Sequence, residues 1–474
     1  MQNDFTFIIM GATGDLAQKK LFPAIHRLIS KNKLGNDFSI VAVARSEFSN
    51  EQFSELVKKK ISGNEAAWKT LEERLYYQKL DFDTMEGYEN LGKFLKKLDK
   101  KRNIKSNKLF YLATLPKHFK GIAKNLKKFG LAEETKKNWC RVVFEKPFGN
   151  DEISAGKLNK EIRKVFAENQ IYRIDHYLGK ELVQNIGVLR GANRIFSPLW
   201  NAENIDHVQI NLLENFGVEN RSNFYDQEGA MKDVGQNHLI QLLCLTAMEI
   251  PKQFNAKSIR DEKVKVLKSI RKIIGKNVVL GQYEGYTEEK GVKRNSNTET
   301  FFAMKLFIDN KRWKGVPFYL RSGKNLGKKF ASIYIQFKEP NLSMFKGQEI
   351  LSNYLVIQIQ PEDGMLVRLN GKAPGEKLKV MSVKMTFCHQ CAFGPNSPEA
   401  YETLIHEALD GDQSVFIRAD EIEESWKIID QAIALKKKPI IYSKNSFGPT
   451  ESEKMMKEKD REWFNKSENV VQGI

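Results

Sequence analysis

Short, continuous apolar runs alternate with helical patterns along the first 175 residues of the chain. Residues 5–10 and 40–44 are unbroken apolar runs, and residues 21–29 between them repeat apolar side chains at helical spacing. Apolar runs of about four to eight residues are typical of strands buried on both faces of a parallel sheet. Further strand-like runs cover residues 75–77, 109–113, 141–144 and 171–174, and further helical patterns cover residues 50–62, 119–129 and 154–169. The alternation predicts a doubly wound α/β fold.

The pattern changes after residue 175, where strands that alternate between apolar and polar residues become common. After a helical pattern over residues 180–190, residues 208–213 alternate as an antiparallel strand does, and residues 233–248 form a long apolar helical pattern. Later strand-like runs cover residues 301–308, 316–320, 332–337, 354–359, 365–369 and 380–387, and helical patterns cover residues 400–409 and 420–435. We therefore expect two domains, residues 1–175 and residues 176–474. The second is expected to be an α+β domain with a large, mainly antiparallel sheet and helices on one face.

The composition of the chain indicates where in the cell the protein is located. The chain has 474 residues, and 41% of them are hydrophobic, which is ample for a packed core. No apolar run reaches about 18 residues, so no membrane-spanning helix is expected. The first residues lack the features of a signal peptide, and four cysteines do not make a disulfide framework. A cytoplasmic location is expected, and the charged tail after Glu451 is expected to be loosely held.

The net charge of +18 fits either of two surfaces. It could belong to a nucleic-acid or membrane binder, or to a lysine-rich surface around a site for anionic small molecules. The lysines are spread widely, and no stretch interleaves basic and aromatic residues as single-strand binders do. We therefore expect neither nucleic acid nor membrane as a partner.

A glycine-rich turn joins the first apolar run to the first helical pattern. It reads GATGDLA over residues 11–17. Gly11 allows the tight turn, Gly14 lets the backbone approach a pyrophosphate, and Ala17 permits close helix–strand packing. The spacing departs from the usual dinucleotide fingerprint, so an ordinary turn is the alternative, but the strand before and the helix after favour nucleotide binding. The predicted cofactor-binding residues here are Gly11, Ala12, Thr13, Gly14, Asp15 and Leu16.

Arg45 indicates which dinucleotide binds. It closes the second apolar run, where NAD-binding proteins place an acidic residue on the ribose 2′-hydroxyl. A guanidinium pairs with a 2′-phosphate, and Thr13 adds a hydroxyl donor, so the sequence favours NADP. Alternatively, Arg45 is a surface cation without a role in cofactor binding. Whether the protein also uses NAD stays open.

Residues 173–181, which read RIDHYLGKE, combine unusually many reactive side chains. If this stretch is extended, the adjacent Asp175 and His176 point to opposite faces and serve different parts of one site. Gly179 permits a sharp turn that brings Lys180 back beside them. Such a ring of donors suits a phosphate, and a charged loop is the alternative. The predicted phosphate-binding residues are His176, Tyr177 and Lys180.

Two further motifs add candidates for the chemistry. Lys146 lies in EKPFG at the end of a predicted parallel strand, the edge at which such sheets bind ligands, and the bond before Pro147 could be cis. His238 ends the stretch DVGQNH, which begins at Asp233. A lone helical histidine is usually a core residue, but Asp175 offers the carboxylate partner that a histidine base needs.

Two remaining stretches are less specific. Residues 312–324 end a strand in an Arg-Ser-Gly-Lys turn at Lys324, followed by Lys328 and Lys329, which suits an anion-binding rim or a solvated turn. Cys388 and Cys391 have C-x-x-C spacing, but no second pair exists for zinc, and an extended backbone would turn their sulfurs to opposite faces. Without an expected strand-to-helix context for redox chemistry, we interpret them as structural and expect no metal site.

Together these stretches resemble the glucose-6-phosphate dehydrogenase family. The matching segments, in order, are residues 11–17, 145–149, 173–181, 189–196 (LRGANRIF), 233–238, 279–283 (VLGQY) and 312–324, and the resemblance extends from residue 7 to residues 448–451 (GPTE). It implies NADP-dependent oxidation of glucose 6-phosphate at C1 to 6-phosphogluconolactone, the first step of the oxidative pentose phosphate pathway. It also implies an NADP-binding domain over residues 1–175 and a substrate and oligomerisation domain over residues 176–474.

The resemblance also implies roles for individual residues. His238 is the expected general base, and Asp175 is expected to orient it. The sugar phosphate is expected on His176, Tyr177 and Lys180, and the sugar hydroxyls on Lys146, Glu214 and Asp233. Lys324, Lys329 and Gln360 are expected to complete the substrate site, and Lys146 also to contact the cofactor. Family members are usually dimers or tetramers, and both stay open here.

The resemblance leaves alternatives open. Lys329 stands where some members have Arg, and the C-terminal tail is short, so a second, structural NADP site is uncertain. A dehydrogenase for another phosphorylated sugar, such as galactose 6-phosphate, is the alternative enzyme. A cofactor-binding sensor without turnover would need a missing base or orienting acid, yet His238 and Asp175 are both present.

Overall fold

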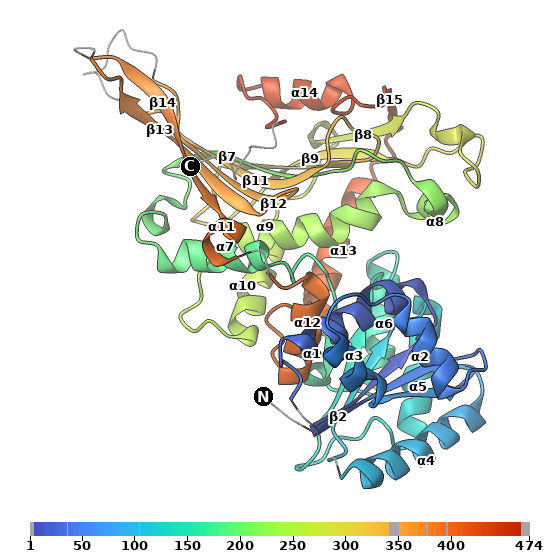
Figure 1. Ribbon diagram of the computed structural model, residues 1–474. Coiled ribbons are helices and arrows are strands. Elements are labelled where there is room, and N and C mark those ends of the chain that lie inside the picture. Colours follow the sequence, from blue (N-terminus) through green and yellow to red (C-terminus); the bar gives the residue numbers. More distant parts are fainter. Residues whose placement is uncertain are drawn as a thin grey trace. The chain divides into compact units, whose positions relative to one another are not determined.

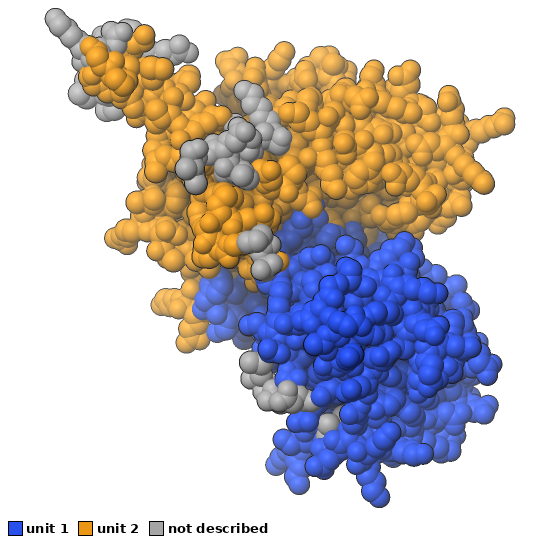
Figure 2. All heavy atoms as spheres, viewed as in Figure 1, with its two compact units in different colours: residues 1–180, 254–260, 398–423 blue, residues 181–253, 261–397, 424–474 orange. Residues whose placement is uncertain are grey.

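The computed structural model divides the chain into two compact units (Figure 2). It describes residues 4–35, 37–103, 105–340, 350–375, 378–394 and 397–465. Unit 1 contains residues 1–180, 254–260 and 398–423, and unit 2 contains residues 181–253, 261–397 and 424–474. Both units are therefore assembled from separated stretches of sequence.

Unit 1 is built on a six-stranded parallel sheet, sheet A, with the strand order β3-β2-β1-β4-β5-β6. Figure 1 shows β2 of this sheet with helices of unit 1 around it. Its strands are β1 Asp4–Met10, β2 Asp37–Ala44, β3 Leu75–Lys79, β4 Lys108–Leu112, β5 Cys140–Phe144 and β6 Ile171–Arg173. Its helices are α1 Phe22–Ser30, α2 Asn50–Lys58, α3 Glu65–Glu72, α4 Met85–Arg102, α5 Phe119–Lys128, α6 Glu152–Arg163 and α12 Ala400–Asp410. This order confirms the predicted doubly wound α/β fold.

The central strands of sheet A are buried on both faces, as their unbroken apolar runs predict. Residues 7–10 of β1 have no solvent exposure, and neither do residues 40–43 of β2. The helix predicted over residues 154–169 ends at Arg163, and a short 3-10 turn precedes β6. The sequence patterns did not lead us to predict α3 or α4.

Unit 2 is built on a nine-stranded mixed sheet, sheet B, with the strand order β14-β13-β12-β11-β7-β10-β9-β8-β15. Its strands are β7 Ile205–Leu213, β8 Val278–Tyr283, β9 Phe301–Phe307, β10 Pro317–Gly323, β11 Phe330–Phe337, β12 Tyr354–Gln360, β13 Gly364–Lys372, β14 Val380–Cys388 and β15 Ile440–Tyr442. Most neighbouring pairs are antiparallel, which confirms the predicted α+β fold, but β10 runs parallel to β7 and β15 runs parallel to β8.

The helices of unit 2 are α7 Glu181–Ala192, α8 Ser222–Ala230, α9 Ile240–Ala247, α11 His389–Phe393 and α14 Thr450–Lys457. A π-helix, Met231–Leu239, precedes α9. α10 Ala256–Lys268 and α13 Ala419–Ile433 are divided between the two units. In the part of the chain that the structure describes, we find no helix long and apolar enough to cross a membrane.

Both faces of sheet B are covered, so the expectation of helices on one face is wrong. The π-helix packs on one face, where a Cβ on Gly235 would lie 2.9 Å from the ring of Phe302. The segment after α14 covers the other face, where the Trp463 ring centroid lies 5.9 Å from that of Tyr319. Tyr319 pairs with Lys305, so these two side chains point to the same face of sheet B. Lys305 is three residues from Phe302, and successive residues of a strand point to opposite faces. Tyr319 and Phe302 therefore lie on opposite faces.

The chain after Glu451 is not loosely held as far as residue 465, which corrects that expectation. α14 buries Met455 and Met456, and the indole of Trp463 donates a hydrogen bond to the Ser452 carbonyl at 2.9 Å. The Phe464 ring stacks on Tyr334 at 4.8 Å. The apolar residues among the charges of this tail therefore anchor it to sheet B; residues 466–474 lie outside the described chain.

Candidate functional site

The carboxyl ends of five strands meet at one edge of sheet A, which we call edge A. The register pairs Met10 with Val43 and with Leu112, and pairs Phe144 with Leu112 and Arg173. Each predicted motif of unit 1 follows one of these strand ends. Edge A therefore brings together the turn at residues 11–16, Arg45, Lys146 and the turn at residues 175–180, as ligand sites in such sheets require.

The glycine turn packs closely against the segment that follows β4, where a side chain at position 11 would clash. Gly11 has a φ of +93°, and a Cβ there would lie 2.5 Å from the Ala113 carbonyl oxygen. The Gln18 amide donates to the Ala12 carbonyl at 2.8 Å and fixes the turn. A helix starts at Asp15 directly behind it and runs on through a π-turn into α1, while Thr13, Gly14 and Asp15 are exposed. An open turn before a helix N-terminus fits a pyrophosphate.

Arg45 lies on the loop that follows β2, next to the glycine turn. The backbone N–H groups of Gly11 and Ala12 both donate to the Val43 carbonyl, at 2.8 and 3.0 Å, which holds the two strand ends together. The buried Tyr77 hydroxyl of β3 donates to the carbonyls of Ala44 and Ser46. The side chain of Arg45 is thus exposed, while hydrogen bonds fix the backbone on both sides of it. A residue that determines ligand specificity needs such a fixed backbone.

Residues 175–180 form successive turns, so the condition under which Asp175 and His176 would point to opposite faces, an extended backbone, is not met. Leu178 N–H donates to the Asp175 carbonyl at 3.0 Å, and Lys180 N–H donates to the Tyr177 carbonyl at 3.1 Å. One Asp175 carboxylate oxygen accepts from Tyr177 N–H at 2.9 Å. β6 ends at Arg173, so the turn hydrogen bonds provide partners for backbone groups that the sheet no longer pairs.

The turn gathers the three predicted phosphate-binding side chains. The His176 and Tyr177 rings lie 5.1 Å apart, and Lys180 Nζ lies 4.8 Å from the Tyr177 ring centroid. Gly179 is needed for close packing rather than for a left-handed backbone, because a Cβ there would lie 2.5 Å from the Ala400 carbonyl of α12.

Lys146 follows β5 at edge A. The peptide bond between Lys146 and Pro147 is cis. Glu145, directly before it, accepts hydrogen bonds from the hydroxyls of Tyr111 and Tyr401. The EKPFG motif thus contributes a cation and a buried carboxyl group to edge A.

Four predicted substrate residues lie along one edge of sheet B, which we call edge B. Glu214 follows β7 and Lys324 follows β10, and these strands pair Leu213 with Gly323. Lys329 directly precedes β11, and Gln360 ends β12 opposite Ala331 of β11. The four residues therefore come from four neighbouring strands.

Glu214 and Lys324 form the polar centre of edge B. Lys324 Nζ contacts a Glu214 carboxylate oxygen at 2.7 Å, and Lys324 is only 6% exposed. The Phe216 ring centroid lies 5.1 Å from Lys324 Nζ and 5.6 Å from Lys329 Nζ. An ion pair over aromatic rings is a preorganised arrangement for sugar hydroxyls and anionic groups.

Asp233 joins edge B through Tyr225 of α8. Arg221 Nη2 lies 3.4 Å from an Asp233 carboxylate oxygen. Burial, and then the charges of Asp233 and Glu214 among others, raise the pKa of Tyr225 well above its usual value. Lys324 Nζ lies 5.2 Å from the same ring, so Lys324 is beside Tyr225, and the charges of Asp233 and Glu214 also act on this tyrosine.

His238 is buried on the π-helix that also contains Asp233. In an α-helix of about 3.6 residues per turn, positions five apart point in different directions. In a π-helix the hydrogen bonds run from residue i to i+5, so Asp233 and His238 lie nearer to one face. Short π-helical stretches often occur at functional sites. The helix predicted over residues 233–248 is confirmed, and its π-helical start was not predicted.

A glycine and a buried carboxyl group fix the start of this π-helix. The Met231 N–H donates to Glu299 at 3.1 Å, and burial raises the pKa of Glu299 to about 7. Gly229 has φ 72° and ψ 174°, and a Cβ there would lie 2.4 Å from a Glu299 carboxyl oxygen. This backbone region is nearly exclusive to glycine.

We expect Gly229→Ala to destabilise the protein by about 2–4 kcal/mol, because it adds backbone strain and a clash with Glu299. The free energy of unfolding, from denaturant titration, measures this. Gly156→Ala in α6 is the matched control, because its Cβ would meet no atom within 4 Å. It should be neutral or stabilising by about 0.5–1 kcal/mol. Equal stabilities for the two variants would contradict the role assigned to Gly229.

Cys388 and Cys391 form a disulfide, so the condition under which their sulfurs would point to opposite faces, an extended backbone, is not met. β14 ends at Cys388 and α11 begins at His389, so the expected absence of a strand-to-helix context is wrong. A helical turn brings residues three apart close together, and the Cα atoms of the two cysteines are 5.2 Å apart.

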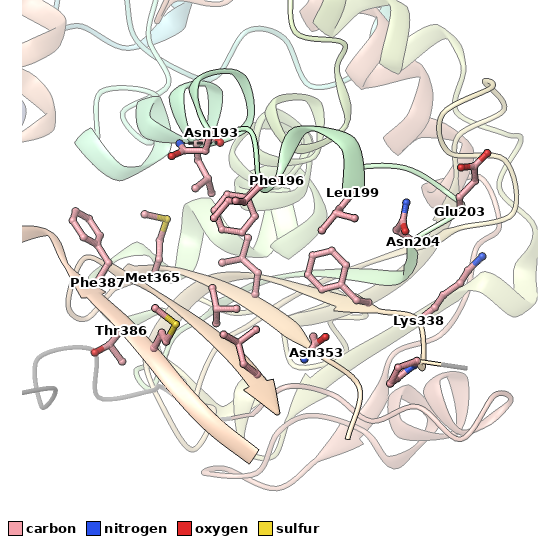
Figure 3. Close-up of a pocket in the computed structure, with 18 of the residues that line it drawn as sticks. Asn193, Phe196, Leu199, Glu203, Asn204, Lys338, Asn353, Met365, Thr386 and Phe387 are labelled. Atoms are coloured by element: carbon pink, nitrogen blue, oxygen red, sulfur yellow. Dashed lines mark hydrogen bonds between the residues drawn. The ribbon is translucent and has the colours of Figure 1, made fainter. Parts of the chain in front are cut away.

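A cavity of about 910 Å³ lies in unit 2, between the segment after α7 and strands β12–β14 (Figure 3). Phe196 and Leu199 face Met365 and Phe387 across it, with Asn204, Glu203 and Lys338 at one end. Its described lining includes none of the predicted site residues. It is thus separate from edge B.

Sequence reasoning missed several residues that shape the two edges. Tyr77 was predicted only to lie in a strand and Tyr225 was not singled out, and both are buried. Phe216 follows Glu214 by two residues, and this closeness is a signal that could have found it. Glu299 lies in a polar stretch, and nothing in the sequence indicates its burial.

Two family models match the chain. "Glucose-6-phosphate dehydrogenase, NAD binding domain" matches residues 8–185, and "Glucose-6-phosphate dehydrogenase, C-terminal domain" matches residues 187–464. A glucose-6-phosphate 1-dehydrogenase of Bacillus subtilis is 43% identical, over 97% of this chain and 98% of that protein. A cytoplasmic isoform of the same enzyme from Solanum tuberosum is 40% identical, over 95% of this chain and 91% of that protein.

Solved structures agree with the sequence comparisons. A structure described as glucose-6-phosphate dehydrogenase in complex with its substrate glucose 6-phosphate has a TM-score of 0.90 and 36% identity, and the match covers 95% of this chain and 96% of that one. Glucose-6-phosphate 1-dehydrogenase from Mycobacterium avium has a TM-score of 0.85 and 33% identity, covering 97% and 98%. These matches confirm the resemblance found in the sequence motifs: the chain belongs to the glucose-6-phosphate dehydrogenase family.

Proposed function

We propose that the protein oxidises glucose 6-phosphate at C1 to 6-phosphogluconolactone with NADP, the first step of the oxidative pentose phosphate pathway. One observation supports this most strongly: a solved relative named for this activity and bound to glucose 6-phosphate matches nearly the whole chain. Within each unit the predicted residues also gather at one strand edge, which is where sheets of this kind bind ligands in unit 1.

The proposed chemistry begins with proton removal from the C1 hydroxyl. Loss of a hydride from C1 is easier when this proton leaves with it, so a positioned base is needed. His238 is the proposed base, and Asp175 is the proposed partner that fixes its tautomer and stabilises the imidazolium. When bound, NADP accepts the hydride at its nicotinamide ring.

The proposed substrate contacts divide between the two edges. The turn at residues 175–180 supplies three donors for the sugar phosphate: His176, Tyr177 and Lys180. Lys324, paired with Glu214, lies beside Tyr225, and the charge of Asp233 also acts on this tyrosine, which supports contacts with sugar hydroxyls. Lys146, Lys329 and Gln360 complete the proposed set.

We expect Lys180→Ala to raise the KM for glucose 6-phosphate about 10- to 100-fold with little change in kcat, because it removes one charge-assisted phosphate contact. Steady-state kinetics with varied glucose 6-phosphate measures this. Lys164→Ala, which removes an exposed lysine paired with Glu161, is the matched control. An unchanged KM for Lys180→Ala would remove this residue from the phosphate site.

The proposed cofactor site consists of the glycine turn, Arg45 and Lys146. The tight turn at Gly11 and the exposed Thr13 and Gly14 fit a pyrophosphate at the helix N-terminus. The exposed Arg45 supports NADP over NAD, because a guanidinium pairs with a 2′-phosphate.

A spectrophotometric assay of reduced cofactor tests the proposed function. Glucose 6-phosphate with NADP should give steady turnover, and galactose 6-phosphate should give much less. No turnover with bound cofactor would favour a sensor instead. A salt-dependent gel shift near physiological ionic strength would indicate nucleic-acid binding, which we do not expect.

Three further assignments remain proposals. We propose that residues 1–175 bind the cofactor and that residues 176–474 bind substrate and mediate homo-oligomer formation. A dimer or a tetramer is expected, and light scattering after size-exclusion chromatography distinguishes them. A cytoplasmic location is proposed, and the potato relative named as a cytoplasmic isoform supports it.

A further inference from the structure

The proposed mechanism does not use the carboxyl group of Glu145, although it lies at edge A, between the ends of β4 and β6. Glu145 directly follows β5, and Tyr111 of the neighbouring strand β4 donates its hydroxyl proton to Glu145 Oε1 at 2.5 Å. Tyr401 in the first turn of α12 donates a second hydrogen bond to the same carboxyl group. Tyr111 is only 1% exposed, so water does not compete for its hydrogen bond.

The surroundings of Glu145 connect it to the predicted site. α12 packs against the turn at residues 175–180, where a Cβ on Gly179 would lie 2.5 Å from the Ala400 carbonyl. The negative charge of Asp175 raises the pKa of Glu145 and of Tyr401, whereas the positive charge of Lys146 lowers the pKa of Glu145. The titratable groups that face Glu145 in unit 1 are Tyr111, Tyr401, Lys146 and Asp175.

Glu145 is balanced between its two protonation states near neutral pH. Burial raises its pKa to about 7, although both tyrosine hydroxyls and Lys146 favour the ionised form. Both phenols can donate to the carboxylate, whereas a protonated Glu145 accepts these hydrogen bonds more weakly and has an O–H group that needs an acceptor of its own. The hydrogen bonds of this cluster therefore depend on the charge of Glu145.

We infer that Glu145, held by Tyr111 and Tyr401, is a positioning residue whose negative charge keeps Asp175 basic and thereby promotes turnover. Like charges at close range raise each other's pKa. A more basic Asp175 stabilises a positively charged partner better, which favours proton removal by the proposed base. This inference rests on the proposed function, because it needs Asp175 to act on that base.

The pH dependence of kcat for glucose 6-phosphate oxidation by the full-length enzyme tests the inference. Glu145→Gln keeps the shape of the side chain but removes its charge. We expect kcat to fall about tenfold at about pH 9, where Glu145 of the wild type is ionised, and to change little at about pH 6, where Glu145 is already protonated. The ionisation near pH 7 should also disappear from its pH profile.

Tyr401→Phe should behave differently from Glu145→Gln. It removes one donor, which raises the pKa of Glu145 further, so fewer molecules have an ionised Glu145 at neutral pH. We expect kcat to be reduced at about pH 7 and restored at about pH 9, where Glu145 ionises again. Tyr111→Phe should show the same pH-dependent recovery. A purely structural contact would give a loss that does not recover with pH.

A matched control and two contrary outcomes complete the test. Glu72→Gln in α3 neutralises another hydrogen-bonded carboxylate of unit 1 and should leave the profile unchanged. The inference is wrong if Glu145→Gln lowers kcat by the same factor at every pH and the kcat of the tyrosine variants stays low at high pH. If Glu145→Gln does not fold, the two tyrosine variants decide the question. A wild-type protein without turnover would instead overturn the proposed function, and this inference with it.

Discussion

Replacing His238 by Asn should lower kcat for glucose 6-phosphate oxidation about 1,000-fold while leaving substrate binding nearly unchanged. General bases contribute about 10²- to 10⁴-fold to rates, and an amide cannot accept a proton at neutral pH. Asn keeps a polar side chain in the buried position of His238, so the π-helix should persist. The measurement is kcat from steady-state kinetics, together with the dissociation constant of glucose 6-phosphate from calorimetry.

The matched control for His238→Asn is Asn237→Ala on the same π-helix. The Asn237 side chain donates to the Asp233 carbonyl at 3.0 Å, so its loss tests whether a local disturbance of the helix is enough to stop turnover. We expect Asn237→Ala to retain most of its kcat. A near-normal kcat in His238→Asn would show that another group is the base, whatever the control does.

The fold of unit 1 could be predicted because its signal is local. Residues 5–10 and 40–44 are apolar throughout since both faces of sheet A are covered, and short runs of this kind are typical of buried parallel strands. α4 could also have been found: its buried residues Tyr88, Leu91, Leu95 and Leu98 have helical spacing, but the lysines between them obscured the pattern. The missed helix was a failure of interpretation rather than of information.

The arrangement at edge B could not be predicted from local pattern. Lys324 and Glu214 are 110 residues apart in sequence, and they meet because β10 pairs in parallel with β7. The alternation of residues 208–213 does not specify a partner strand or its direction. Family resemblance could assign both residues to the substrate site, but only the register places them on adjacent strand ends.

The hydrogen-bond register of a helix is also hidden in the sequence. Residues 231–239 have an ordinary helical composition, yet they form a π-helix that brings Asp233 and His238 toward one face. Likewise, C-x-x-C spacing suits an extended strand or a turn, and only the end of β14 at Cys388 decides between them. Both errors came from assuming regular geometry across the end of an element.

Edge A has one residue whose replacement should change cofactor choice rather than stability. Arg45 is exposed just beyond β2, and Tyr77 holds the carbonyls on both sides of it. Its side chain does not support the fold, so its charge can be reversed without a packing cost. The backbone that positions it should therefore be the same in the variant and the wild type.

Arg45→Asp should raise the KM for NADP roughly 100-fold and leave the KM for NAD equal or lower. The substitution removes a charge-assisted pair with the 2′-phosphate, worth about 1.5–3 kcal/mol, and adds repulsion. Meanwhile the new carboxylate can accept a hydrogen bond from the ribose 2′-hydroxyl of NAD. The ratio of kcat/KM for the two cofactors measures the change. Lys79→Ala, which removes an exposed cation at the end of β3, is the control for net charge and should leave the ratio unchanged. An unchanged ratio in Arg45→Asp would mean that another residue sets the cofactor preference.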